Sequence, residues 1–175
     1  KGFEENLEDS TDNLKKVLGG HYPDDFNFVE QKFEDLPAEE QREHLLTAPM
    51  READAVVFCI TAVSVQDMNE EYFDPIKKRI AAIAHLNHNS IILITKMDHV
   101  FPGIAENPYD MTYKNAVGDM TLEVFLHNAK DLCGLNRVLY VVNYTGEMHR
   151  SFQMDSLAFK AMNEIKNCCK SRRTI

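Results

Sequence analysis

Three short and almost purely apolar runs, at residues 55–60, 91–94 and 138–142, constrain the fold more than any other feature. Runs of this kind are typical of strands that are buried on both faces of a sheet. Longer segments with apolar residues at helical spacing separate them, so strands and helices alternate along the chain. This order is typical of parallel β-α-β units joined by right-handed crossovers. The sequence therefore predicts an α/β fold with an open, mainly parallel sheet and flanking helices.

The spacing of apolar residues also predicts where the helices lie. Pro49 is expected to end the second helix, because proline interrupts helical hydrogen bonding. In the third helix, Met68 and Tyr72 are expected on the face toward the sheet, and Arg79 on the polar face. The expected helices cover residues 7–18, 37–48, 68–84, 120–132 and 155–168.

The composition narrows the classes of protein to consider. The chain has 175 residues, 44% of them apolar and 27% charged, which is typical of a globular domain. Its formal net charge of −9 argues against binding nucleic acid through a broad basic surface. No apolar run approaches the roughly 20 residues of a membrane span, and the first residues do not resemble a signal peptide. The four cysteines have neither zinc-ligand nor disulfide-framework spacing, so we expect a cytoplasmic protein.

Polar residues follow the second apolar run at once, and they carry the main functional prediction. Thr95-Lys96-Met97-Asp98 matches the [N/T]-K-x-D pattern that recognises guanine in P-loop GTPases, and ligands of open α/β sheets bind at this end of the strands. The Asp98 carboxylate is an acceptor for both the ring N–H and the exocyclic amine of guanine. Lys96 is expected to lay its alkyl stem along the base, and Thr95 to tie the loop to its neighbours. A polar transition from strand to loop is the alternative explanation.

Two further positions fit the same prediction. The third apolar run opens into Asn143-Tyr144-Thr145, where GTPases place backbone N–H groups against the base oxygen. The usual S-A-K sequence is absent, so an ordinary turn before a helix fits equally well. Lys1-Gly2 fits either the second half of a D-x-x-G motif, whose glycine N–H meets the γ-phosphate, or an unrelated start. The candidate nucleotide-binding residues are Gly2, Thr95, Lys96, Asp98, Asn143, Tyr144 and Thr145.

The sequence lacks the phosphate-binding half of a GTPase. No G-x-x-x-x-G-K-[S/T] segment occurs, nor an upstream Ser/Thr motif for Mg²⁺. Without the strand that bears this loop, residues 55–60 are expected to form an open sheet edge. We therefore expect residues 1–175 to be the C-terminal part of one incomplete P-loop GTPase-like domain. Residues 1–50 would form a switch-proximal helical region, and residues 51–175 the guanine-recognition half.

Four short segments carry a resemblance to a known family. They are His21-Tyr22-Pro23-Asp24, Arg51-Glu52-Ala53-Asp54, Thr95-Lys96-Met97-Asp98 and Val141-Val142-Asn143-Tyr144. In this order they resemble the interferon-induced protein 44 family, over nearly the whole chain. The resemblance implies a cytoplasmic GTP-binding protein of the interferon-induced antiviral immune response. It also implies GTP or GDP with Mg²⁺ as cofactor, although Mg²⁺ ligands are absent from this chain, and slow GTP hydrolysis by a complete domain only.

Two other functions fit the sequence. A non-catalytic GTPase-like interaction module in innate immunity would present the loop at residues 101–118, with Phe101, Tyr109 and Tyr113, to a protein partner. A flavodoxin-like or receiver-like domain would use Asp98 only as an acid at a strand end. This alternative leaves Thr95 and Lys96 without a role. An intact phosphate loop upstream would favour the GTPase over the interaction module.

The expected partners follow from these functions. They are guanine nucleotide and either a protein partner or a second copy of the chain in a homodimer, with no nucleic acid and no membrane. Cys168 and Cys169, beside Lys170, Arg172 and Arg173, would suit an acylated, basic membrane tail. We expect instead that these cysteines lie in a frayed, reduced C-terminus.

Overall fold

The computed structural model describes residues 7–22, 35–68, 70–84, 89–142 and 151–172. The chain divides into two compact units, Lys1–Asp54 and Ala55–Ile175. In the described part, no helix combines the length and the apolar character needed to cross a membrane.

Two helices are described in the first unit, α1 (Leu7–Leu18) and α2 (Ala38–Arg51), and both were predicted. Just after α1, Gly20 adopts a φ of 70°, the left-handed conformation in which a glycine ends a helix without steric strain. The prediction that Pro49 ends α2 is wrong, because α2 continues to Arg51. A proline in the last turn removes one backbone hydrogen bond only, and the helix ends two residues later.

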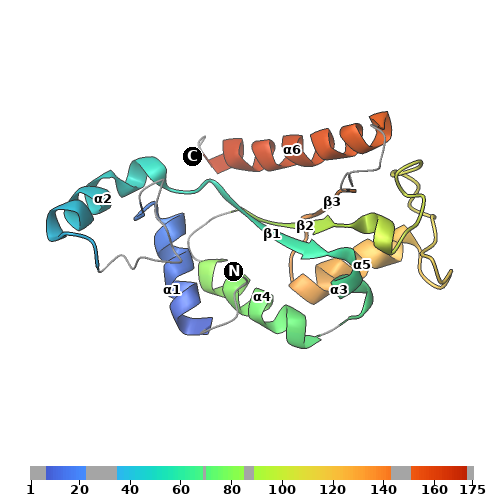
Figure 1. Ribbon diagram of the computed structural model, residues 1–175, viewed down its shortest axis with the longest axis horizontal. Coiled ribbons are helices and arrows are strands. Elements are labelled where there is room, and N and C mark those ends of the chain that lie inside the picture. The colour runs from blue at the N-terminus through green and yellow to red at the C-terminus, as the bar shows by residue number, and fades with distance from the viewer. Residues whose placement is uncertain (1–6, 23–34, 69, 85–88, 143–150, 173–175) are drawn as a thin grey trace. The chain divides into compact units, whose positions relative to one another are not determined.

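Three parallel strands, adjacent in the order β1-β2-β3, form the sheet of the second unit (Figure 1). They are β1 (Ala55–Thr61), β2 (Asn89–Thr95) and β3 (Val138–Tyr140). The predicted α/β class with an open parallel sheet is therefore confirmed. β3 is shorter than predicted, although the Val141 N–H donates to the Ile94 C=O (2.9 Å) and extends the pairing by one residue.

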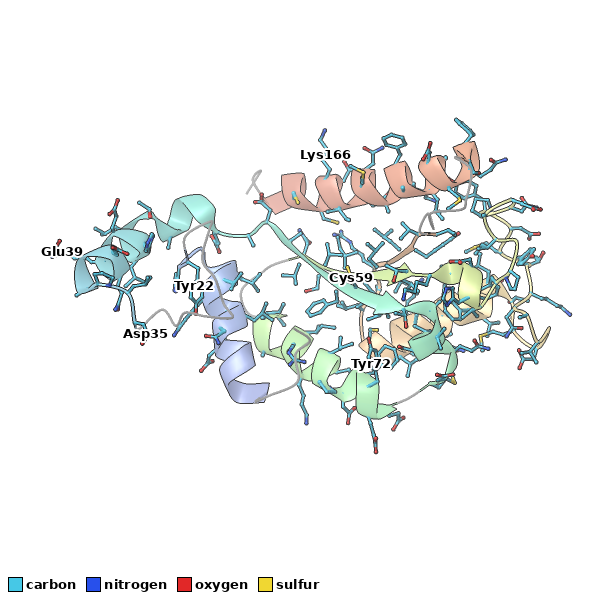
Figure 2. The ribbon with its side chains drawn as sticks, viewed as in Figure 1. Tyr22, Asp35, Glu39, Cys59, Tyr72 and Lys166 are labelled. Carbon is cyan, nitrogen blue, oxygen red and sulfur yellow. The ribbon has the colours of Figure 1, made fainter. Side chains whose placement is uncertain are left out.

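The strands differ in burial according to their place in the sheet. β2 lies in the centre, and Ile91, Ile92 and Ile94 are completely buried, as predicted for a strand covered on both faces. β1 lies at an edge of the sheet, and the same prediction is wrong for it. Ile60 is buried, but Cys59 (Figure 2) is exposed and the other residues of β1 are only partly buried.

Helices cover both faces of the sheet (Figure 1). The long helix α6 (Phe152–Arg172) runs along one face, and α3 (Ala62–Gln66), α4 (Glu70–Ile83) and α5 (Leu122–Cys133) lie on the other. The sequence did not predict α3 as a separate helix. It begins at the end of β1, where the Thr61 hydroxyl accepts from the Ser64 N–H (3.4 Å).

The predicted faces of α4 need three corrections. Met68 precedes α4, has a φ of 47° and is exposed, because the short α3 takes up the chain after β1. Tyr72 is exposed and packs edge-on against the buried ring of Phe73 (5.1 Å between centroids). Arg79 is only 2% exposed, and burial lowers the pKa of its guanidinium. It lies three residues after Ile76, so it shares the apolar face.

The last two helices have the predicted positions but differ in extent. α5 begins after Thr121 and ends at Gly134, which is left-handed with a φ of 66°. α6 continues to Arg172, so the expectation of a frayed end is wrong as far as the structure is described. Cys168 is buried, and the Arg137 guanidinium donates to its sulfur at 2.7 Å (Nη1 to Sγ). An exposed thiol, which acylation would require, is therefore not available at this position.

Candidate functional site

The predicted guanine-recognition segment lies at the carboxyl end of the central strand. Thr95 is the last residue of β2 and is paired in register with Thr61, the last residue of β1. The Thr95 hydroxyl donates to the Ile60 C=O (Oγ1 to O, 3.2 Å), which ties the ends of the two strands together. The place at which the loop leaves the sheet is thereby fixed against β1.

Lys96 turns the chain sharply out of the sheet. Its backbone is left-handed, with φ 56° and ψ 41°, a conformation that costs a residue with a side chain about 1 kcal/mol or more. The turn leads into the 3₁₀ helix η3 (Met97–His99), and the His99 N–H donates to the Lys96 C=O (3.1 Å). As a result the Lys96 side chain is exposed while Met97, the next residue, is completely buried.

Asp98 is held on this turn between two buried residues, Met97 and Val100. Its side chain is 28% exposed, so solvent or a ligand reaches part of the carboxylate. The imidazole of His99 is 3.9 Å away (Nε2 to Oδ2), too far for a hydrogen bond. The backbone position of Asp98 is therefore set by its buried neighbours, and the carboxylate keeps acceptor capacity on its exposed side.

Asn115 also supports this turn, although the sequence pattern did not indicate a role for it. It is buried, and its Oδ1 accepts from the N–H groups of Gly118, Asp119 and Met120 at 2.9–3.2 Å. Its Nδ2 donates to the Asp119 carboxylate (2.7 Å). The next N–H, of Ala116, donates to the Val100 C=O (2.9 Å), two residues after Asp98. The only sequence signal was an Asn shortly before a Gly-Asp pair, which is a weak indication of a side-chain-stabilised turn.

The loop at residues 101–118 is packed against the core, in contrast to the partner surface that the sequence suggested. Phe101 is completely buried and meets Phe125 edge-on, with 5.2 Å between ring centroids. The Tyr113 hydroxyl donates to the backbone C=O of Pro102. Only Tyr109 of the three aromatic residues is well exposed, so the predicted aromatic docking surface is wrong for Phe101 and reduced for Tyr113.

The other predicted site residues lie outside the described part of the chain. These are Gly2, Asn143, Tyr144 and Thr145. The strand before them ends beside Thr95, because Val141 pairs with Ile94 and Val142 is buried in the core. Thr95, Lys96 and Asp98 are thus the candidates that the structure brings together.

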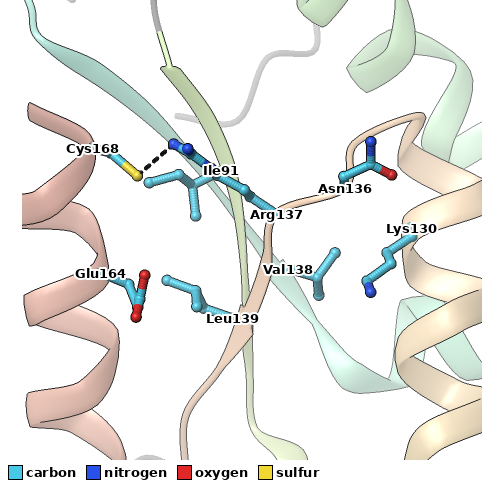
Figure 3. A pocket seen from close by; sticks show the side chains of 8 residues that line it. All are labelled: Ile91, Lys130, Asn136, Arg137, Val138, Leu139, Glu164 and Cys168. Carbon is cyan, nitrogen blue, oxygen red and sulfur yellow. Dashed lines mark hydrogen bonds between the residues drawn. The ribbon is translucent and has the colours of Figure 1, made fainter. Parts of the chain in front are cut away.

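A small cavity of about 140 Å³ lies at the opposite, amino end of the sheet, next to the edge strand β3 (Figure 3). In Figure 3, Glu164 and Cys168 of α6 lie on one side of β3 and Lys130 of α5 on the other. Arg137 is engaged there by Cys168 and by the Asn89 amide oxygen (Nη1 to Oδ1, 3.3 Å). Cavities that enclose a ligand of nucleotide size usually measure about 300 Å³ or more, so this one is not a nucleotide site.

The described residues include three of the predicted nucleotide-binding side chains, Thr95, Lys96 and Asp98, at the end of β2 and on the turn that follows it. Among all the described residues, no group of three or more His, Cys, Asp or Glu side chains is placed to hold a metal ion.

No known protein family, no curated protein and no solved structure matches this chain. The sequence motif and the geometry of the turn that carries it are therefore the features that bear on function.

Proposed function

We propose that the turn after β2 binds the guanine base of GTP or GDP, as part of a P-loop GTPase-like domain. The observation that supports this most strongly is the position of Asp98, partly exposed on a fixed turn at the carboxyl end of the central parallel strand. Open α/β sheets bind ligands at this end. The motif and its place in the fold thus agree.

Each side chain has a separate role in this proposal. The Asp98 carboxylate accepts from the ring N–H and the exocyclic amine of guanine, and adenine offers no such pair of donors. Lys96 lays its alkyl stem along the base and keeps its ammonium group in water. Thr95 does not touch the base but holds the turn against β1 through its bond to Ile60.

The resemblance to the interferon-induced protein 44 family supports the wider role. The chain would form the guanine-recognition half of a cytoplasmic GTP-binding protein of the interferon-induced antiviral response. Phosphates and Mg²⁺ would be held by residues outside the described part. Slow hydrolysis would depend on positioning and electrostatics in the complete domain, since phosphoryl transfer needs little side-chain chemistry.

A titration with GTP and ATP tests the proposal, made with Mg²⁺ on this chain and on a polypeptide extended upstream. GTP-selective binding by the longer polypeptide is the expected result. In Asp98→Asn the amide still accepts one N–H but presents a donor to the guanine amine, so GTP affinity should fall about a hundredfold or more. The same amide suits the carbonyl oxygen of xanthine, so affinity for xanthosine triphosphate should rise.

Asp131→Asn is the matched control, because Asp131 is an exposed carboxylate on α5 and the change has the same chemistry. It should leave both affinities unchanged. If Asp98→Asn binds GTP as tightly as the unmodified protein does, Asp98 does not recognise the base. If the folded longer polypeptide binds no nucleotide at all, the chain belongs to a GTPase-like interaction module instead.

A further inference from the structure

The helix α6 carries apolar side chains on two opposite faces. One face packs on the sheet through residues that are almost completely buried, namely Met154, Leu157, Ala161 and Cys168. On the other face Phe152, Phe159 and Met162 are 84%, 64% and 63% exposed. With about 100° of rotation per residue, Phe152 and Phe159 point away from the sheet, and Met162 lies on the adjoining flank, about 60° from Phe159. Single exposed apolar side chains are common, but three on the same side of one helix are a feature of the kind that marks an interface.

This exposed side of α6 has the spacing of a coiled-coil seam. Asp155 lies between the two phenylalanines, and Lys166 and Cys169 continue the line beyond Met162. From one of these residues to the next, the spacing alternates between three and four positions, as in a coiled coil. We define the outer seam of α6 as Phe152, Asp155, Phe159, Met162, Lys166 and Cys169. It is about 26 Å long at 1.5 Å per residue. Figure 2 shows Lys166 on the side of α6 that faces away from the sheet, in agreement with this assignment.

We propose that the outer seam binds the outer seam of a second copy of this chain, with the two α6 helices antiparallel. In such a pair the helices run in opposite directions, so a residue near the start of one outer seam packs against a residue near the end of the other. We call each pair of facing residues a layer. Phe159 then meets Met162 of the second copy, Asp155 meets Lys166, and Phe152 meets Cys169. Because a two-fold axis relates the copies, each of these layers occurs twice.

Charge complementarity selects this arrangement over the parallel one. In the antiparallel pair both charged layers join a carboxylate to an ammonium group. In a parallel pair Asp155 would face Asp155 and Lys166 would face Lys166, and both layers would be repulsive. A carboxylate accepts several hydrogen bonds, so contacts of Asp155 within its own chain are compatible with the ion pair.

The neighbouring loop leaves the seam open. Tyr109 lies along one flank of α6, where its hydroxyl is 3.0 Å from the Ser156 hydroxyl. The Lys160 ammonium group lies over the Tyr109 ring, 5.2 Å from its centre. Neither Ser156 nor Lys160 belongs to the outer seam. Because the Lys160 ammonium group lies over the Tyr109 ring, it is held on the flank of α6 and away from the apolar residues of the seam.

Sedimentation velocity of the whole chain over about 1–100 µM tests the proposal, because a single helix pair at the low end of interface sizes associates in this range. We expect a reversible monomer–dimer equilibrium. Phe159→Glu should weaken dimerisation at least about tenfold, since it places a charge in a central apolar layer. Val124→Glu is the control, because Val124 is a half-exposed apolar residue on α5, and it should have no effect.

A charge exchange tests the antiparallel orientation independently of folding. Asp155→Lys and Lys166→Asp should each weaken self-association several-fold. In a dimer of either variant, positions 155 and 166 carry the same charge, so both charged layers become repulsive. Mixing the two variants should restore association, since every charged layer of the mixed dimer then joins opposite charges. Circular dichroism of each variant verifies that α6 remains folded.

Three results would overturn the proposal: a chain that stays monomeric throughout this range, a dimer that Phe159→Glu leaves intact, and charge variants that do not recover on mixing. The third result would reject the antiparallel layers even if a dimer forms. None of these measurements involves nucleotide, so the outcome is separate from the test of guanine binding.

Discussion

At the carboxyl end of the sheet the chain exposes Lys96 and part of Asp98 on a turn, whereas at the amino end Arg137 and its neighbours enclose a small cavity. Two cationic residues, Lys130 and Arg137, line the cavity, and Arg137 is already engaged by Asn89 and Cys168. At the turn, hydrogen bonds and buried neighbours fix the backbone. If the turn binds a base as proposed, changes at the turn should alter nucleotide affinity and changes at the amino-end cavity should not.

The largest expected effect is on the support of the turn. Asn115→Ala removes a buried oxygen that accepts from three N–H groups, so three hydrogen bonds that hold this loop together are lost. The free energy of unfolding should fall by about 3 kcal/mol, measured by urea denaturation. Nucleotide affinity should fall with it, because the loop that holds Val100 loosens. Asn136→Ala, an exposed residue beside the cavity, should change neither quantity appreciably.

The next largest effect is expected in the reactivity of the cysteine thiols toward alkylation. Burial raises the pKa of Cys133, near the amino end, from 9.0 to about 11, and Lys77 offsets only part of the effect. At neutral pH its thiolate fraction is then about a hundredfold lower than that of an ordinary thiol. Alkylation followed by mass spectrometry should modify the exposed Cys59 first and Cys133 last.

The same pKa shift predicts how stability depends on pH. The unfolded thiol ionises near 9.0 and the folded one near 11, so the unfolded chain binds fewer protons between these values. Cys133 should therefore contribute a loss of stability as the pH rises from 9 to 11. Cys133→Ser should flatten the stability profile in this interval, and an unchanged slope would argue against the shift.

A moderate effect is expected at the cavity. Arg137→Ala removes the donor shared by Asn89 and Cys168 and should lower the free energy of unfolding by about 1 kcal/mol. GTP affinity should not change, because the residue lies at the opposite end of the sheet. A large loss of affinity in this variant would invalidate the separation of the two ends.

The smallest effect on stability is expected at Lys96, where one substitution should change stability and nucleotide affinity in opposite directions. Lys96→Gly relieves a left-handed backbone and should raise the free energy of unfolding by up to about 1 kcal/mol. Nucleotide affinity should nevertheless fall about tenfold, since the alkyl stem over the base is lost. Met68→Gly relieves the same kind of strain at an exposed position away from the turn and should leave the affinity unchanged.

The parts of the fold that depend on local signals could be predicted from the sequence. The central strand β2 followed from a continuous apolar run, and the end of α5 followed from Gly134. Arg79 could not be placed, because its burial depends on how α4 packs. α3 was missed because its five residues are too few to show a helical period.

The candidate site divides in the same way. The motif Thr95–Asp98 and its position after a strand were visible in the sequence. The bond from Thr95 to Ile60 joins residues 35 positions apart, and the sequence does not show which partner such a hydroxyl finds. Asn115 was missed for a similar reason, since its role depends on the backbone groups that the loop directs toward it.

Hydrolysis of the Asn115 amide to a carboxylate would change the chemistry of this loop. Slow hydrolysis would release ammonia and leave a carboxylate where the Nδ2 group now donates to Asp119 at 2.7 Å. Two carboxylates at that separation repel, so one must bind a proton or the loop must open. Stored protein would then lose its fixed turn in proportion to a mass increase of about one dalton in the peptide that contains this residue, with no change in the amino-acid sequence that its gene encodes.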